Sequence, residues 1–70
     1  MMEIRLKVTR HAKEKMVVHG ISLEQVRRAI QQGAKIRQTE GYLASYAYLK
    51  VAYREISEGY YKIKTVFLNR

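Results

Sequence analysis

Histidines beside cations are the first side chains in this sequence that could do chemistry. His11, Lys15 and His19 are spaced to project from neighbouring turns of a helix. Histidine is the side chain best suited to proton transfer near neutral pH. A structural interpretation stands beside this one, in which His11 forms a local hydrogen bond near a helix start and the stem of Lys15 covers a sheet edge. The sequence leaves both interpretations open.

Tyrosines interleaved with cations form the second candidate group. All six tyrosines lie in the second half of the chain. Aromatic rings beside cations on an exposed sheet can stack on unpaired bases. Tyrosines also fill the strands of small cores, and we expect most of them to be structural, with one or two left for stacking. The cations between them are Lys50, Arg54, Lys62 and Lys64.

The composition excludes most other kinds of site. The sequence contains no cysteine and no aspartate, so it lacks a thiolate zinc site, an EF-hand loop and a Ser-His-Asp triad. His11 and His19 would lie about 12 Å apart on one helix, too far to share an ion. His11 and Glu14 could clasp one, but two ligands do not make a metal site. We therefore expect no metal and no cofactor.

Positive charge is the main compositional feature. Fourteen Lys and Arg residues stand against six acidic residues, which gives a net charge of +8. Such an excess indicates a polyanionic partner, nucleic acid above all, although charge also serves solubility alone. The cations are spread along the chain, and no stretch approaches the roughly 20 apolar residues of a membrane span. We expect a soluble cytoplasmic protein that does not bind membranes.

The hydrophobic pattern predicts an α+β fold for a single domain over residues 1–70. Two short helices form a helical hairpin, which packs on a small antiparallel sheet of three to four strands. Thr9 caps the first helix, and a capping box of Ser22 and Gln25 opens the second. The alternating stretches are residues 1–8 as an optional first strand, then 34–39, 42–48, 49–56 and 60–68.

The last predicted strand assigns side chains to the two faces of the sheet. Strict alternation places four of its residues on the core face, namely Tyr61, Ile63, Thr65 and Phe67. Lys62 and Lys64 then fall on the opposite face, together with Lys35 and Arg37 from an earlier strand. We expect that face to be open to water, because both helices cover the other one.

The sequence resembles a widespread prokaryotic family of small domains of unknown function, numbered 4258, through the stretches TRHAKEKMVVHGISLEQVRRAI and YKIKTVF. The resemblance implies a RelE-like fold, akin to the small ribonuclease toxins of the RelE and BrnT kind. Two positions depart from the family pattern, because Lys15 and His19 stand where arginine is usual. The planar guanidinium of arginine can donate two hydrogen bonds to one phosphate, and the lysine ammonium cannot match this geometry. Tight bidentate binding of phosphate is therefore not expected here.

The resemblance and the charge together suggest an RNA-binding domain with a toxin-like fold, and by extension an endoribonuclease of a toxin–antitoxin system. Cleavage without a metal needs a base, an acid and cations around the phosphate. His11 is the candidate base or acid and Tyr53 the candidate second group. The candidate nucleic-acid contacts are Lys15, Arg54, Lys62 and Lys64.

Two alternatives stay open on the sequence. One is a nucleic-acid-binding module without catalysis, for which RNA is favoured over DNA. The other is a protein-interaction domain, which forms a homodimer through a strand edge or pairs with an acidic antitoxin partner.

Overall fold

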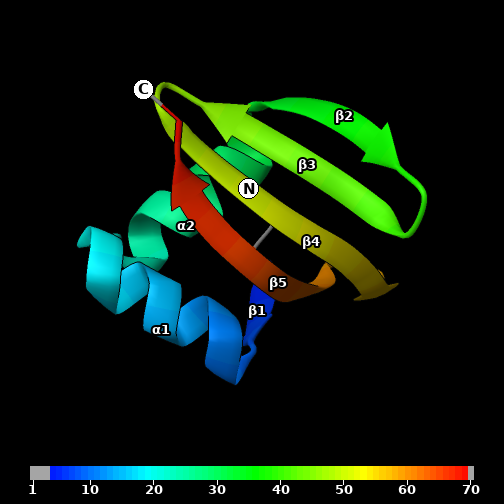
Figure 1. The fold of residues 1–70 in the computed structure, drawn as a ribbon. Coiled ribbons are helices and arrows are strands. Elements are labelled where there is room, and N and C mark those ends of the chain that lie inside the picture. The colour runs from blue at the N-terminus through cyan, green and yellow to red at the C-terminus, as the bar shows by residue number, and fades with distance from the viewer. Residues whose placement is uncertain (1–3, 70) are drawn as a thin grey trace.

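Residues 4–69 form two helices and five strands in the computed structural model, which describes this part of the chain (Figure 1). The α+β class and the two packed helices are confirmed, with five strands instead of three to four. In chain order the elements are β1 (Arg5–Val8), α1 (Arg10–His19), α2 (Leu23–Gln32), β2 (Ala34–Gln38), β3 (Gly41–Tyr46), β4 (Leu49–Ser57) and β5 (Tyr60–Leu68).

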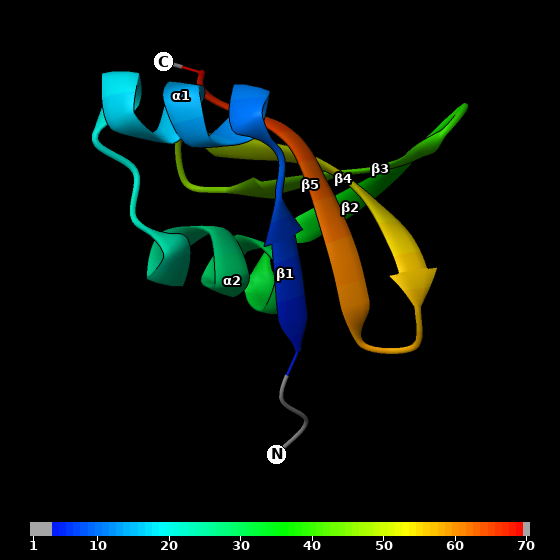
Figure 2. The same cartoon turned by 90° about the horizontal axis from the view of Figure 1, so that it is seen from below.

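The sheet is mixed, in the order β1-β5-β4-β3-β2. Strands β2 to β5 pair antiparallel with their neighbours, whereas β1 lies at an edge and runs parallel to β5. The expectation of a wholly antiparallel sheet is therefore wrong at β1. Both helices lie on one side of the sheet, with α1 against β5 and α2 against β3 and β4 (Figure 2). The other side, which we call the helix-free face, has no helix over it.

Local capping explains where the helices begin. The Thr9 hydroxyl accepts a hydrogen bond from the backbone N–H of Ala12 at the start of α1. Ser22 and Gln25 form the predicted reciprocal capping box at the start of α2. Gly20 ends α1 with φ at 66°, a left-handed conformation that glycine adopts without a steric cost. Within residues 4–69, neither helix has the length and apolar character to span a membrane.

The core lies between the helices and one face of the sheet. Apolar side chains from both helices meet those of the three central strands there. Its largest fully buried side chains are Ile63, Val26, Val51 and Val66. The core is small, so its stability depends on each of these contacts.

A β-bulge in β5 changes which side chains face this core. Tyr53 pairs with Ile63, but the preceding residue Ala52 pairs with Thr65, so Lys64 is an extra residue. The extra residue reverses the alternation beyond it, because successive side chains of a strand point to opposite faces. The core face of β5 therefore consists of Tyr61, Ile63, Val66 and Leu68.

Strand pairing corrects two face assignments made from the sequence, one in β5 and one in β2. Thr65 and Phe67 were expected in the core, but the bulge turns them to the helix-free face, where Phe67 is 38% exposed. Lys35 and Arg37 were expected on the open face. They pair with Ala44 and Tyr42, which face the side of the helices, so the two cations share that side. They remain exposed because β2 is the edge strand.

The tight β3–β4 turn contains a left-handed, non-glycine residue that the sequence pattern does not predict. Tyr46 pairs directly with Leu49, so Ala47 and Tyr48 alone connect the strands. Ala47 has φ at 55°, which costs a non-glycine residue about 1–2 kcal/mol. The turn lacks the Asn-Gly or Asp-Gly pair that usually marks such a connection.

The bulge predicts opposite responses at two neighbouring positions. Val66→Gln should lower the free energy of unfolding by about 3 kcal/mol, because it places an amide in a fully buried and tightly packed position. Phe67→Gln should lower it by about 1 kcal/mol or less, because this side chain meets solvent. Urea denaturation followed by circular dichroism measures both. The reverse order of the two effects would show that β5 has no bulge at Lys64.

Candidate nucleic-acid interface

Three cations lie side by side on the helix-free face. Lys7 on β1 pairs with Lys62 on β5, and Lys62 pairs with Arg54 on β4. Residues paired across strands project from the same face. The neighbouring row of Val8, Ile63 and Tyr53 faces the core, so this row must face the other way. We call Lys7, Lys62 and Arg54 the cation row.

Aromatic side chains stand on both sides of the cation row along β5. Towards the start of the strand, Tyr60 pairs with Arg5, whose guanidinium lies over the tyrosine ring at 5.0 Å from its centre. Towards the end of the strand, Phe67 pairs with Lys50. The Lys50 ammonium donates a hydrogen bond to the Ser45 hydroxyl, which holds it on this face. The helix-free face thus combines cations with aromatic rings.

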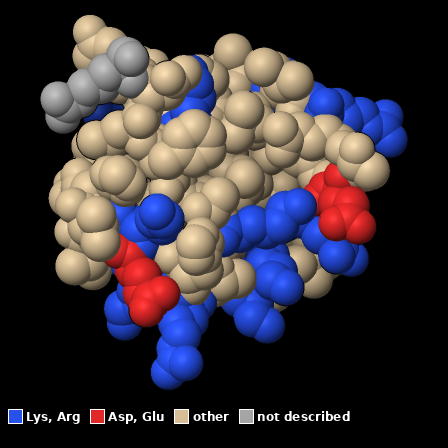
Figure 3. Space-filling view, in the orientation of Figure 1, with Lys and Arg blue, Asp and Glu red and all other residues tan. Residues whose placement is uncertain are grey.

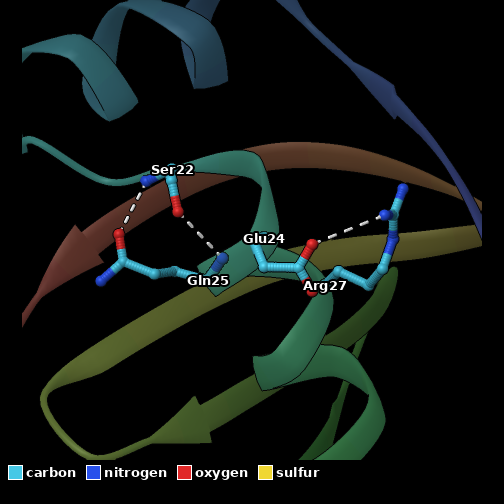
Figure 4. Close-up of polar contacts among 4 residues, drawn as sticks. All are labelled: Ser22, Glu24, Gln25 and Arg27. Atoms are coloured by element: carbon cyan, nitrogen blue, oxygen red, sulfur yellow. Dashed lines mark hydrogen bonds and ion pairs between the residues drawn. The ribbon is translucent and has the colours of Figure 1, made fainter.

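Electrostatic repulsion within the cation row needs an explanation. Like charges directly opposite one another in a sheet are destabilising. An ion pair joins Arg27 to Glu24 at 4.0 Å on α2, beside the capping box (Figure 4), and contributes no negative charge to the row. A bound polyanion would relieve the repulsion, because it would place negative charge between the cations.

The surface as a whole has an uneven charge distribution. In the orientation of Figure 1, lysine and arginine gather over the lower half of the view, along α1 and across the lower strands (Figure 3). Acidic side chains interrupt this area near its left and right margins. A polyanion approaching this side would meet mainly positive charge.

The structure separates the residues predicted from the sequence to form one site. Arg54 and Lys62 are brought together as a cross-strand pair in the cation row. The Lys64 ammonium donates a hydrogen bond to the backbone carbonyl of Glu40 at 2.6 Å, which ties it to the β2–β3 turn. His11 is exposed and Lys15 half-buried, and both lie on α1, on the opposite side of the sheet.

Tyr53 also lies on the side of the helices. It is 3% exposed and packs between two other tyrosines, stacked on Tyr42 at 5.8 Å and edge-on to Tyr61 at 5.4 Å between ring centres. Burial raises the pKa of its hydroxyl above the ordinary 10.0, and Tyr61, Tyr42 and Glu55 raise this pKa further. The raised pKa makes Tyr53 a weaker proton donor than an ordinary tyrosine, and its protonated hydroxyl cannot act as a base at neutral pH.

Metal chemistry has no evident site in the described part of the chain. Among residues 4–69, no three histidine or glutamate side chains lie close enough together to hold an ion.

Comparison with known proteins identifies the family. The family model described as a domain of unknown function (DUF4258) matches residues 8–68. The chain belongs to this family. A search of solved structures finds a chain of the toxin–antitoxin complex RelBE2 from Mycobacterium tuberculosis, with a TM-score of 0.64 and 16% identity, over 97% of this chain and 100% of that one. At this identity the match shows a shared fold, which confirms the RelE-like architecture. No curated protein matches significantly.

Three residues of the candidate interface in this DUF4258 domain were missed by sequence reasoning. Arg5 and Lys7 were treated as part of an optional strand, and Phe67 was assigned to the core. The sequence gives no clear signal for Phe67, because residues 66–68 are all apolar and strict alternation from Tyr61 and Ile63 leads to Phe67. The bulge that turns this side chain outward shows only in the pairing of β5 with β4.

The raised pKa of Tyr53 predicts a loss of stability in alkaline solution. The folded domain holds the Tyr53 proton more tightly than the unfolded chain does. The stability that this difference contributes is therefore fully present below about pH 10, and it is lost as the pH rises through the folded-state pKa. Urea denaturation at about pH 9 and about pH 11 should therefore show a smaller fall in the free energy of unfolding for Tyr53→Phe than for the wild type. If the free energy of unfolding fell equally in the wild type and in Tyr53→Phe, groups other than Tyr53 would be responsible for the loss of stability in alkaline solution.

Proposed function

We propose that this domain binds RNA through the helix-free face of its sheet. The observation that carries the proposal is the cation row, in which Lys7, Lys62 and Arg54 lie opposite one another across three strands. Backbone phosphates are the natural counter-charge for such a row. The net charge of +8 supports a polyanionic partner, and the resemblance to ribonuclease toxins favours RNA over DNA.

The arrangement of side chains supports binding more than cleavage. A metal-free ribonuclease needs its base, acid and cations around one phosphate. His11 and Tyr53 lie on the helix side of the sheet, whereas Arg54 and Lys62 lie on the helix-free face. A single phosphate in contact with the cation row would therefore be separated from both proposed proton-transfer groups by the sheet. The experiment with His11→Ala below tests the endoribonuclease hypothesis, which predicts cleavage products.

Arg54→Gln should weaken RNA binding. We expect roughly fivefold lower affinity at about 0.1 M salt, because one phosphate contact is lost. The slope of log affinity against log salt concentration should become shallower by about one, because about one counterion fewer is released. Fluorescence anisotropy with a labelled RNA, repeated from about 0.05 to about 0.2 M salt, measures both quantities. Arg28→Gln is the matched control, since Arg28 is another exposed arginine but lies on α2.

Two results would contradict this proposal. Binding that is undetectable, or that does not depend on salt, would remove the nucleic-acid partner. The catalytic alternative is tested by incubating wild type and His11→Ala with ribosomes and with naked RNA. We expect no cleavage products from either protein, and equal RNA affinity for the two. Products formed by the wild type and lost in His11→Ala would establish a ribonuclease instead.

A second candidate function, protein binding, rests on the edge strand β2. All five of its residues are exposed, and its outer edge has no partner strand in the described chain. Such an edge can accept an extended segment of another protein. Lys35 and Arg37 project from one face of β2, which favours an acidic partner strand. They disfavour a second copy of this chain, because antiparallel self-pairing centred on Ile36 places Lys35 opposite Arg37 of that copy.

Reversing one of these charges should create a dimer. In Arg37→Glu, self-pairing about Ile36 would place Lys35 of each copy opposite the introduced carboxylate of the other, so repulsion becomes attraction. We expect light scattering at two concentrations to show a monomer for the wild type and a concentration-dependent dimer for Arg37→Glu. Arg28→Glu on α2 changes the net charge equally and should stay monomeric. A wild-type dimer would favour self-association through β2 or another surface.

A further inference from the structure

Phe67 occupies an unusual position for its residue type. It lies on the helix-free face, 38% exposed, on a strand whose neighbouring residues Val66 and Leu68 pack into the core. Unlike tyrosine, phenylalanine has no hydroxyl that gains from contact with water. Within residues 4–69, its ring makes no aromatic or cation–π contact. The domain thus presents an unoccupied ring on its cationic face.

The surroundings of Phe67 match those of a nucleotide contact. Its cross-strand partner Lys50 lies on the same face and donates its ammonium hydrogen bond to Ser45 on β3. The cation row begins at Lys62, whose partner Arg54 lies four residues from Lys50 on β4, a distance of about 13 Å at the usual rise per residue. Phosphate contacts and an aromatic ring therefore follow one another along a single strand. The other ring on this face, Tyr60, is already covered on one side by Arg5.

We infer that Phe67 stacks on a base, and that the ligand of this face is unpaired rather than double-stranded RNA. The inference rests on the proposed RNA-binding function and specifies its substrate class. In a duplex, the faces of the bases are covered by their neighbours, so a ring on a protein surface meets only the backbone and groove edges. A single strand can turn a base outward onto Phe67 while its phosphates lie along the cation row.

Removing the ring while keeping an apolar side chain tests the inference. Phe67→Leu should bind an unstructured, labelled RNA of about ten nucleotides roughly tenfold more weakly than the wild type, because stacking is lost. Its salt dependence should be unchanged, because no phosphate contact is removed. Phe67→Tyr should restore the affinity. Binding of a duplex of the same length should be equally weak in all three proteins.

A matched control separates stacking from general surface effects. Tyr42 is exposed to nearly the same extent, at 37%, but it lies on the opposite face. Tyr42→Leu should leave the affinity for the single strand unchanged, with circular dichroism confirming that both variants are folded. Equal weakening by Tyr42→Leu and Phe67→Leu would overturn the inference.

The remaining outcomes distinguish the inference from the function on which it rests. If Arg54→Gln weakens binding but Phe67→Leu does not, the face binds phosphates without stacking, and the inference alone fails. If the duplex binds as tightly as the single strand, the substrate class is wrong. If no RNA binds in a salt-dependent way, the proposed function and the inference fail together.

Discussion

The arrangement of this domain depends on the junction between Thr9 and the bulge in β5. The Thr9 hydroxyl caps α1 by accepting from Ala12, and it donates to the carbonyl of Ile63 at 2.9 Å, with the Lys64 carbonyl at 3.3 Å. The Thr9 backbone N–H also donates to Ile63. A bulge leaves backbone groups without partners in the sheet, and an unsatisfied polar group is costly when it is shielded from water. One side chain therefore stabilises the bulge and fixes the start of the helix beside it.

The bulge links the core to the candidate interface. It turns Val66 and Leu68 towards the helices, and it turns Phe67 towards solvent. A regular strand would exchange these sets, burying the phenylalanine and exposing two aliphatic side chains. The same irregularity thus completes a small core and supplies an aromatic ring to the cationic face. Bulges are common where a sheet must redirect a side chain.

The helix-free face carries a cost that the fold does not require. A row of three cations across β1, β5 and β4 repels itself, and a domain of this size has little stability to spare. Such a conflict between stability and local charge is expected at a binding surface, where the partner supplies the missing counter-charge. The family match and the RelBE2 neighbour establish the fold, but unrelated functions can share one fold. The case for RNA therefore rests on the side chains of this face.

The sequence by itself determined the helices and their caps, since Thr9, Ser22, Gln25 and Gly20 act on backbone groups within a few residues. It also determined the α+β class and the net charge. Tertiary structure decided the parallel pairing of β1, because that contact joins residues far apart in the chain. It decided the faces of Phe67, Lys35 and Arg37 as well. A strand's alternation states which residues share a face only while its register is regular, and register is set by the neighbouring strand. The sequence therefore supplied the cations, and the pairing of the strands brought Lys7, Lys62 and Arg54 into one row.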